Sequence, residues 1–366
     1  MSDNIPFDIQ AEIMKRLPVK SLIQFRLVSK LWKSLIDSSA FIAEYQRTEL
    51  QQHILVRDGI GRKYVSIADD DTFPHQKVPL AVPMSIKTLG RPGIIGCSQG
   101  LFCLFDEFGK PSDSGKKTAV IWNPTIRKSV AINMPAPSYQ TYQIVGFGVC
   151  PDTLDPILVN MLWDKSETTP TWIVDVFKLS WGVWKSLSVN LPGRTIVTLN
   201  TERVAIDKFI YFHASDWSSC SDLILSFDMI SEEFTEIRLP GTLAINYNMQ
   251  TGICKFGESL IVHQSEREVD EPEYGIWMME NGDPVSFKKI FTIKSNLPAN
   301  TSISGVFGSR KSGEVLINVK KCLEEEEYEL WVYDPNSEHI DYISTYARYF
   351  SFFVSSYTET LLLLDR

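Results

Sequence analysis

Residues 5–36 read IPFDIQAEIMKRLPVKSLIQFRLVSKLWKSLI, an apolar stretch of helical period that decides how the rest of the chain is understood. Pro6 suits the first turn of a helix, because its missing N–H would make no hydrogen bond there. Apolar residues recur at steps of four from Ile5 to Leu17, and this spacing predicts one apolar helical face. Pro18 is expected to end the helix, since proline cannot continue the hydrogen-bond ladder.

The helical pattern continues beyond Pro18. Ser21 and Ser29 are placed to cap a second and a third helix, and residues 41–50 predict another short one. A segment of this size rarely sustains its own core, and its apolar residues lie on more than one helical face. The helices could pack entirely on the body behind them. We favour the alternative, in which part of their apolar surface awaits another protein.

From about residue 53 the hydrophobic period changes from helical to alternating. Residues 53–57 and 63–67 flank Asp58-Gly59, which predicts a β-hairpin, and Asn281-Gly282 marks another. Units of strand, turn and strand recur at a spacing of roughly 50 residues, typical of a propeller blade. Small sheets bury their faces only against neighbours, so such repeats close into a ring. We expect an all-β, propeller-like body of about six blades, with C-terminal strands completing the first.

Composition excludes several classes of function. A net charge of −9 argues against nucleic acid as a partner, because phosphate binding needs clustered Lys and Arg. No apolar run is long enough to cross a membrane. The 6 cysteines are scattered without metal spacing and indicate free thiols in a reducing compartment. The first residues lack the pattern of a secretory signal, so we expect the chain in the cytoplasm, the nucleus or both.

Catalytic signals are weak. Gly96-x-Ser98-x-Gly100 matches the nucleophile elbow of hydrolases, but that motif needs a following helix, and the next residues predict a strand. We therefore expect a glycine turn there. His213 and His263 are expected to end strands at equivalent positions of two repeats, without metal spacing. The sequence thus predicts no catalytic residue, no metal site and no cofactor.

The helical stretch has a clear family resemblance. Glu12-Ile13, then Arg16-Leu17-Pro18-Val19-Lys20-Ser21-Leu22, then Phe25-Arg26-Leu27-Val28-Ser29-Lys30 and Trp32 together resemble the F-box of plant proteins. The resemblance implies binding to a Skp1-like adaptor and, through it, to a cullin. It implies that these residues lie at or just behind the adaptor interface: Pro6, Ile9, Ile13, Leu17, Pro18, Leu22, Val28 and Trp32. Some of them must be core residues instead, and the sequence does not separate the two groups.

The body resembles the plant F-box-associated domain of type 1, which is kelch-like. The resemblance rests on Gly96-Cys97-Ser98-Gln99-Gly100-Leu101-Phe102-Cys103-Leu104, on Trp122-Asn123-Pro124-Thr125 and on Val145-Gly146-Phe147-Gly148. We therefore expect two domains, an F-box at residues 1–47 and a substrate-recognition domain at residues 48–366. Polar loops that contain Trp163 and Trp217 are our candidates for contact with a target protein.

Together these patterns predict the substrate-recognition subunit of an SCF (Skp1–cullin–F-box) ubiquitin ligase, which tethers an unidentified protein for ubiquitination and degradation. Such a subunit performs no chemistry and acts by proximity. Two alternatives remain open. One is an interaction scaffold that docks a Skp1-type protein without ubiquitin transfer, and the other is a propeller enzyme of hydrolase or oxidase type.

Overall fold

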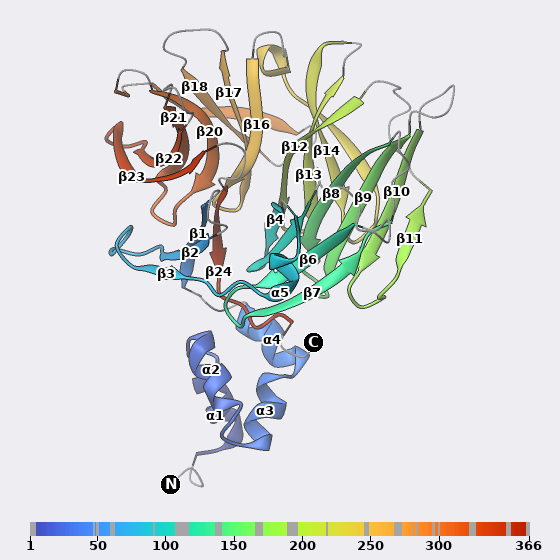
Figure 1. Ribbon diagram of the computed structural model, residues 1–366, viewed down its shortest axis with the longest axis vertical. Helices are drawn as coiled ribbons and strands as arrows, with labels where there is room; N and C mark the ends of the chain where they lie inside the picture. Colours follow the sequence, from blue (N-terminus) through green and yellow to red (C-terminus); the bar gives the residue numbers. More distant parts are fainter. Residues whose placement is uncertain are drawn as a thin grey trace.

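The computed structural model consists of a short helical module followed by a ring of β-sheets (Figure 1). It describes residues 5–46, 48, 51–58, 63–90, 92–106, 117–135, 141–164, 171–188, 197–216, 219–244, 249–266, 273–280, 282, 285–294, 297–298, 301–321, 327–348 and 353–363. The module contains helices α1 (Phe7–Met14), α2 (Val19–Phe25), α3 (Lys30–Ile36) and α4 (Ser39–Gln46).

The starts of the module's helices confirm some sequence predictions and correct others. Ser29 caps α3, because its hydroxyl accepts a hydrogen bond from the Trp32 N–H at 3.1 Å. The prediction that Ser21 caps α2 is wrong: Pro18 is the N-cap residue, and Ser21 lies inside the helix. A proline at this position costs no backbone bond, so the helix begins directly after it. Helix α4 also begins earlier than expected, at Ser39.

Six four-stranded antiparallel sheets form the body, which is a six-bladed β-propeller, as the sequence predicted. Blade 1 contains β1 (Gln52–Asp58), β2 (Lys63–Ala68), β3 (Lys77–Pro79) and β24 (Phe353–Thr358), and blade 2 contains β4 (Gly93–Ser98), β5 (Leu101–Phe105), β6 (Thr118–Asn123) and β7 (Lys128–Asn133). Blade 3 contains β8 (Thr141–Val149), β9 (Pro156–Asp164), β10 (Thr171–Lys178) and β11 (Trp184–Leu187). Helix α5 (Met84–Lys87) connects blades 1 and 2.

The remaining blades repeat the same up-and-down order. Blade 4 contains β12 (Val197–Ile206), β13 (Phe209–Asp216), β14 (Ser221–Asp228) and β15 (Phe234–Arg238), and a 3₁₀ turn η2 (Gly241–Ala244) follows it. Blade 5 contains β16 (Met249–Phe256), β17 (Ser259–Glu266), β18 (Tyr274–Glu280) and β19 (Ser286–Ile293). Blade 6 contains β20 (Thr301–Ser309), β21 (Val315–Lys321), β22 (Glu327–Asp334) and β23 (His339–Arg348).

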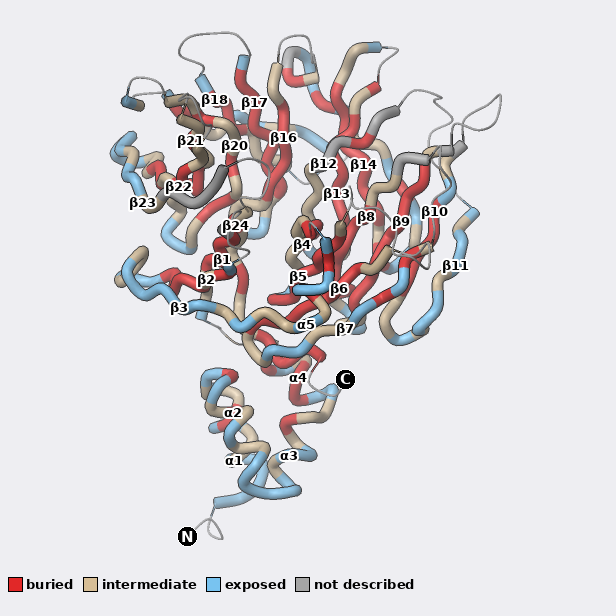
Figure 2. The backbone as a smooth tube through the Cα atoms, in the orientation of Figure 1, coloured by how far each residue is buried: buried red, intermediate tan, exposed pale blue. Residues whose placement is uncertain are grey.

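Blade 1 closes the ring. Its inner strand β24 comes from the C-terminal part of the chain and pairs with β1. Strands β1 and β2 pair as predicted from Asp58-Gly59, although Gly59 itself lies outside the described residues. The second predicted hairpin joins β18 and β19, although Asn281 itself lies outside the described residues. Inner strands of five blades line a central cavity of about 700 Å³. The apolar core lies within and between the blades (Figure 2).

The helical module shares its core with the propeller. Buried side chains of the module, such as Leu22 and Tyr45, belong to the same apolar cluster as Phe105 and Phe147 of blades 2 and 3. Leu361, from the chain's C-terminal end, lies in this cluster as well. The module therefore docks on the propeller through side chains that are far apart in sequence.

Candidate functional site: an exposed apolar patch on the helical module

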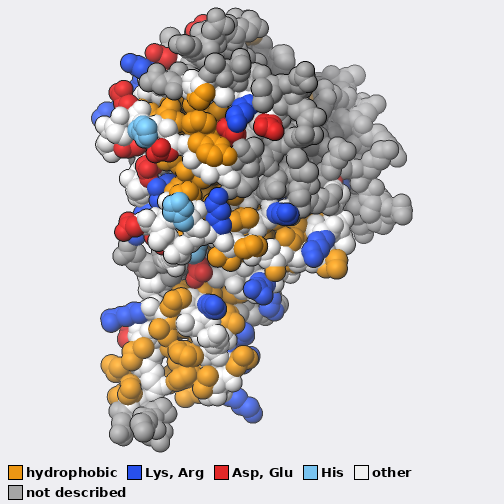
Figure 3. Space-filling view, turned by 60° about the vertical axis from the view of Figure 1, so that its left-hand side comes forward, with side chains coloured by type: hydrophobic (Ala, Val, Ile, Leu, Met, Phe, Trp, Pro, Cys, Tyr) orange, Lys and Arg blue, Asp and Glu red, His pale blue; other side chains and the backbone are white. Residues whose placement is uncertain are grey.

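Large apolar side chains are exposed on the outer part of the helical module (Figure 3). Half of the exposed large hydrophobic side chains of the described chain lie in residues 5–31, which is less than a tenth of the sequence. We call this group the apolar patch; it consists of Ile5, Phe7, Ile9, Ile13, Leu27, Val28 and Leu31. Concentrated exposure of this kind is typical of a protein interaction site.

The patch is held in place by the packing behind it. Met14, Leu22 and Ile36 are almost fully buried and turn the opposite faces of their helices toward the propeller. The Trp32 indole N–H donates to the side-chain oxygen of Gln10 at 2.9 Å and so ties α3 to α1. The apolar residues of α1 are thereby divided between an inner and an outer face.

An ion pair joins the end of α2 to the end of α3. Arg26 donates through Nε and Nη2 to the two Asp37 carboxylate oxygens at 2.5 and 2.8 Å, and Lys33 Nζ lies 3.1 Å from the same group. Partial burial would raise the pKa of Asp37, but the hydrogen bonds from Arg26 and Lys33 outweigh burial and hold it below its ordinary value. Asp37 is therefore a charged brace for the turn that presents Leu27 and Val28.

The structure places the residues expected at the adaptor interface in three environments. Pro6, Ile9, Ile13, Pro18 and Val28 are exposed, Leu17 and Trp32 are half-buried, and Leu22 is fully buried. Ile9, Ile13 and Val28 lie in the apolar patch, whereas Leu22 packs in the shared core. Whether these residues contact an adaptor remains a prediction.

The prediction did not include four residues of the patch. Ile5 precedes the first helix and Phe7 begins it, and Leu27 and Leu31 lie at and just after the α2–α3 turn. The turn carried a usable signal, because Leu27-Val28 places two large apolar side chains where polar residues are usual. Leu27 is the most exposed of them, at 87%.

The two candidate target contacts lie in the propeller. Trp163 is half-buried on β9 and packs against Trp172 on β10, with ring centroids 4.8 Å apart. The first residue of β9, Pro156, lines a cavity beside α4. Because a strand rises about 3.3 Å per residue, Trp163 lies roughly 23 Å further along, at the end of blade 3 away from the module. Trp217 lies outside the described residues.

The hydrolase-like motif forms a turn between strands, as predicted. Ser98 ends β4, and Gln99 and Gly100 connect it to β5 with positive φ angles of 48° and 76°. The Ser98 hydroxyl accepts a hydrogen bond from the Val149 N–H at 3.0 Å and so joins blades 2 and 3.

Within the described ranges, no group of three or more His, Cys, Asp or Glu side chains is arranged to hold a metal ion. Of the helices in the same ranges, none is long and apolar enough to cross a bilayer.

Comparison with known proteins gives matches to both parts of the chain. The family model of the F-box associated beta propeller domain matches residues 90–362, and that of the F-box domain matches residues 2–43. An F-box/kelch-repeat protein of Arabidopsis thaliana is 25% identical over 344 residues, which cover 90% of this chain and 89% of that protein. An F-box protein of the same plant is 27% identical over 312 residues, covering 83% and 74%. A solved protein from Lactobacillus plantarum aligns with a TM-score of 0.41 and 10% identity, over 84% of this chain and 99% of that one, a likeness too distant to support an argument.

Proposed function

Because this chain belongs to the plant F-box proteins that carry an F-box associated β-propeller domain, we propose that it is the substrate-recognition subunit of an SCF ubiquitin ligase. In this role the F-box binds a Skp1-like adaptor and, through it, a cullin, while the propeller holds a target protein. The chain itself performs no chemistry. It raises the local concentration of target lysines near the ubiquitin carrier.

The apolar patch is the observation that carries this proposal. Covering an exposed apolar side chain such as Leu27 with another surface lowers the free energy of the complex. The reason is that a well-packed interface removes most of the side chain's apolar area from water. The patch residues lie in the part of the module that is exposed in Figure 2, so the described part of the propeller leaves them uncovered. We propose that the adaptor packs on Ile9, Ile13 and Val28 and on the neighbouring patch residues.

We further propose that the target binds at the end of the propeller away from the F-box. Trp163 lies at that end of blade 3 and is partly accessible beside Trp172. Aromatic side chains of this kind often provide the anchors of protein interfaces. A target bound there would lie on the side of the propeller opposite the F-box and its adaptor.

Charged substitutions in the patch test the adaptor interface. Ile9→Asp and Leu27→Asp each place a carboxylate where an apolar contact is proposed, so each is expected to weaken binding to a Skp1-type protein by about tenfold to a hundredfold. Both side chains are exposed, at 51% and 87%, so the isolated fold should tolerate them. Binding is measured by calorimetry with the purified adaptor.

Val183→Asp is the matched control. Val183 is 56% exposed in the β10–β11 turn of the propeller, so this change adds the same charge outside the patch. Its affinity for the adaptor should equal that of the unchanged chain. Normal binding by both patch variants, or an equal loss in the control, would contradict the proposed interface.

A further inference from the structure

The last described residues of the chain are buried although they belong to no strand. We call Glu359–Leu363 the C-terminal strap; it follows β24 and runs beneath the ring beside α4 (Figure 1). Thr360 and Leu361 are fully buried, and Leu362 and Leu363 are nearly so. Because these residues lie outside the sheet, their backbone groups must find partners elsewhere.

Asn123, at the end of β6, supplies two of those partners. Its side-chain NH₂ group donates to the carbonyl oxygens of Thr360 at 3.0 Å and Leu362 at 2.8 Å. Its side-chain oxygen accepts from the N–H groups of Thr125 at 2.9 Å and Ile126 at 3.3 Å. The fully buried amide therefore serves two segments at once, the β6–β7 turn and the strap.

Other blades show that the turn alone does not require an amide. The equivalent residues, at the ends of β14 and β22, are Asp228 and Asp334. Asp228 accepts from the Ile230 N–H at 2.8 Å, and Asp334 accepts from the Asn336 N–H at 2.9 Å. A carboxylate thus satisfies this turn, but it has no hydrogen to donate when ionised. The donors of Asn123 are needed only for the strap.

The turn between β4 and β5 makes room for the same segment. A Cβ atom on Gly100 would overlap the carbonyl oxygen of Thr358 and lie 2.8 Å from Cγ2 of Thr360. Gly100 also has a φ of +76°, which a larger residue adopts only with strain. Two segments that are separate in the sequence, around Gly100 and Asn123, therefore form one seat for the strap.

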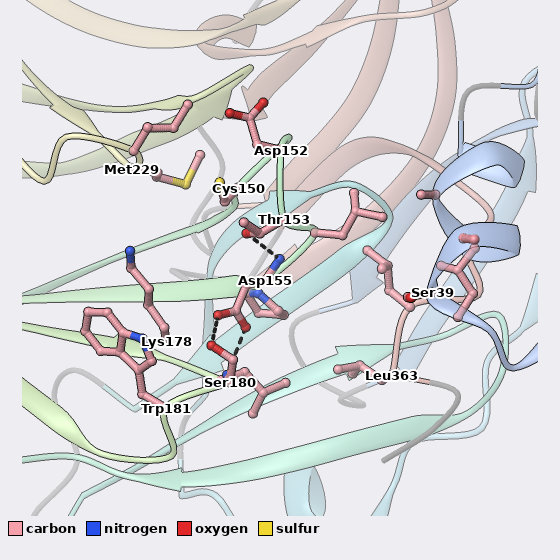
Figure 4. Close-up of a pocket in the computed structure, with 18 of the residues that line it drawn as sticks. Ser39, Cys150, Asp152, Thr153, Asp155, Lys178, Ser180, Trp181, Met229 and Leu363 are labelled. Atoms are coloured by element: carbon pink, nitrogen blue, oxygen red, sulfur yellow. Dashed lines mark hydrogen bonds between the residues drawn. The ribbon is translucent and has the colours of Figure 1, made fainter.

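The other side of the strap contacts the F-box. The Gln46 side-chain amide of α4 donates to the Thr360 hydroxyl. The backbone N–H of Val19 in α2 partly offsets the rise that burial causes in the pKa of Glu359, so α2 also lies beside the strap. Leu362 and Leu363 line a cavity of about 750 Å³ together with Ser39 of the F-box (Figure 4). The strap consequently lies between the two domains and bonds to both.

We propose that the strap is a splint that sets the orientation of the F-box relative to the propeller, and that Asn123 is the residue that positions it. This inference rests on the proposed function in one respect: a fixed orientation matters because a ligase must hold its target at a defined place. The geometry itself requires no partner. Strand β24 thus closes the propeller ring, and the strap that follows it holds the F-box against the ring.

Asn123→Asp is the discriminating variant. It keeps the oxygen that the turn uses, as in blades 4 and 6, and replaces the two donors by an oxygen that faces two carbonyl oxygens. Loss of buried hydrogen bonds of this kind should speed amide exchange in the strap and in α4 by at least about tenfold. Small-angle scattering of the full chain should show a wider range of F-box orientations, while amide exchange in β13 and β14 stays unchanged.

Asp334→Asn is the matched control, because it makes the reverse exchange of the same groups at the equivalent turn of blade 6, where Asp334 accepts from Asn336 and Ser337. It should change neither exchange in α4 nor scattering. Gln46→Ala, which removes the bond on the F-box side, should loosen α4 without affecting blade 2. Two outcomes would refute the splint. In the first, neither Asn123→Asp nor Gln46→Ala changes amide exchange in α4 or the scattering. In the second, Asn123→Asp opens blade 2 as a whole while Gln46→Ala has no effect. None of these readouts involves the adaptor, so a failed adaptor interface would appear separately, in the calorimetry.

Discussion

At the scale of single residues, a buried histidine of blade 4 has a strongly shifted pKa and lies beside two carboxylates. His213 Nδ1 lies 3.0 Å from the Glu202 carboxylate, and its Nε2 lies 3.5 Å from Asp222. Burial would lower the pKa of His213, but hydrogen bonds to Asp222 and Glu202 outweigh burial and raise it to about 9. The neighbouring His263 lacks such carboxylate bonds, and burial lowers its pKa to about 4. Both residues lie inside strands β13 and β17, so the expectation that they end strands is wrong.

This difference predicts a pH dependence of stability. A pKa that is raised on folding means that the protonated ring stabilises the fold below pH 6.5, its ordinary pKa, and that this contribution is lost as pH rises through about 9. Between pH 6.5 and about 9, the free energy of unfolding should therefore fall in the unchanged chain. This fall should exceed the fall in His213→Gln by up to about 3 kcal/mol. Urea denaturation at several pH values measures this. His263→Gln is the control, since His263 is neutral across this range; the same slope in His213→Gln and the unchanged chain would disprove the charge assignment.

At the scale of secondary structure, the F-box helices are short and depend on a few side-chain bonds between them. The Tyr45 hydroxyl donates to the Leu17 carbonyl oxygen at 2.8 Å and joins α4 to the connection between α1 and α2. Arg26 and Asp37 join the end of α2 to the end of α3. Isolated helices of this length are unstable in water, so packing and these bonds keep them formed.

Asp37→Ala is expected to loosen α2 and α3. The variant leaves the Arg26 guanidinium in a partly buried position without its carboxylate, at a cost of about 1 to 2 kcal/mol. Amide exchange in both helices should become faster, by a factor of about ten. Lys33→Ala removes a more exposed partner of the same carboxylate and should have less than about half of this effect. Equal exchange rates in Asp37→Ala and the unchanged chain would show that the ion pair does not brace these helices.

At the scale of the whole molecule, the two ends of the chain depend on each other. Strand β24 completes blade 1 by pairing with β1, and the strap that follows it lies against the F-box. The N-terminal domain, the first blade and the last residues therefore form one connected structure. The domain division after residue 47 remains a prediction. Side chains of α4 and of the propeller belong to one apolar cluster, so packing alone does not mark a boundary there.

Removal of β24 and the strap tests this dependence. A chain that ends at residue 352 leaves β1 as an unpaired inner edge and exposes the core beneath α4, so it should lose its single cooperative unfolding transition and aggregate. A chain that ends at residue 363 keeps every described residue and should unfold like the full chain. Calorimetry and size-exclusion chromatography measure both. A monomeric shorter chain with an unchanged melting temperature would contradict the proposed closure.

Local sequence patterns were enough to predict the helical module, the repeated strands, the pairing of β1 with β2 and the glycine turn after Ser98. These features follow from patterns of neighbouring residues, because hydrophobic period and turn chemistry act over a few positions. Which apolar residues of the module are exposed depends on packing between distant segments, which the sequence pattern does not contain. Ile9 and Leu22 are equally apolar, and burial of one alone depends on what packs against it. In the same way, Asn123 was visible as part of a motif, but its partners lie 237 and 239 residues away and are set by the closing of the ring.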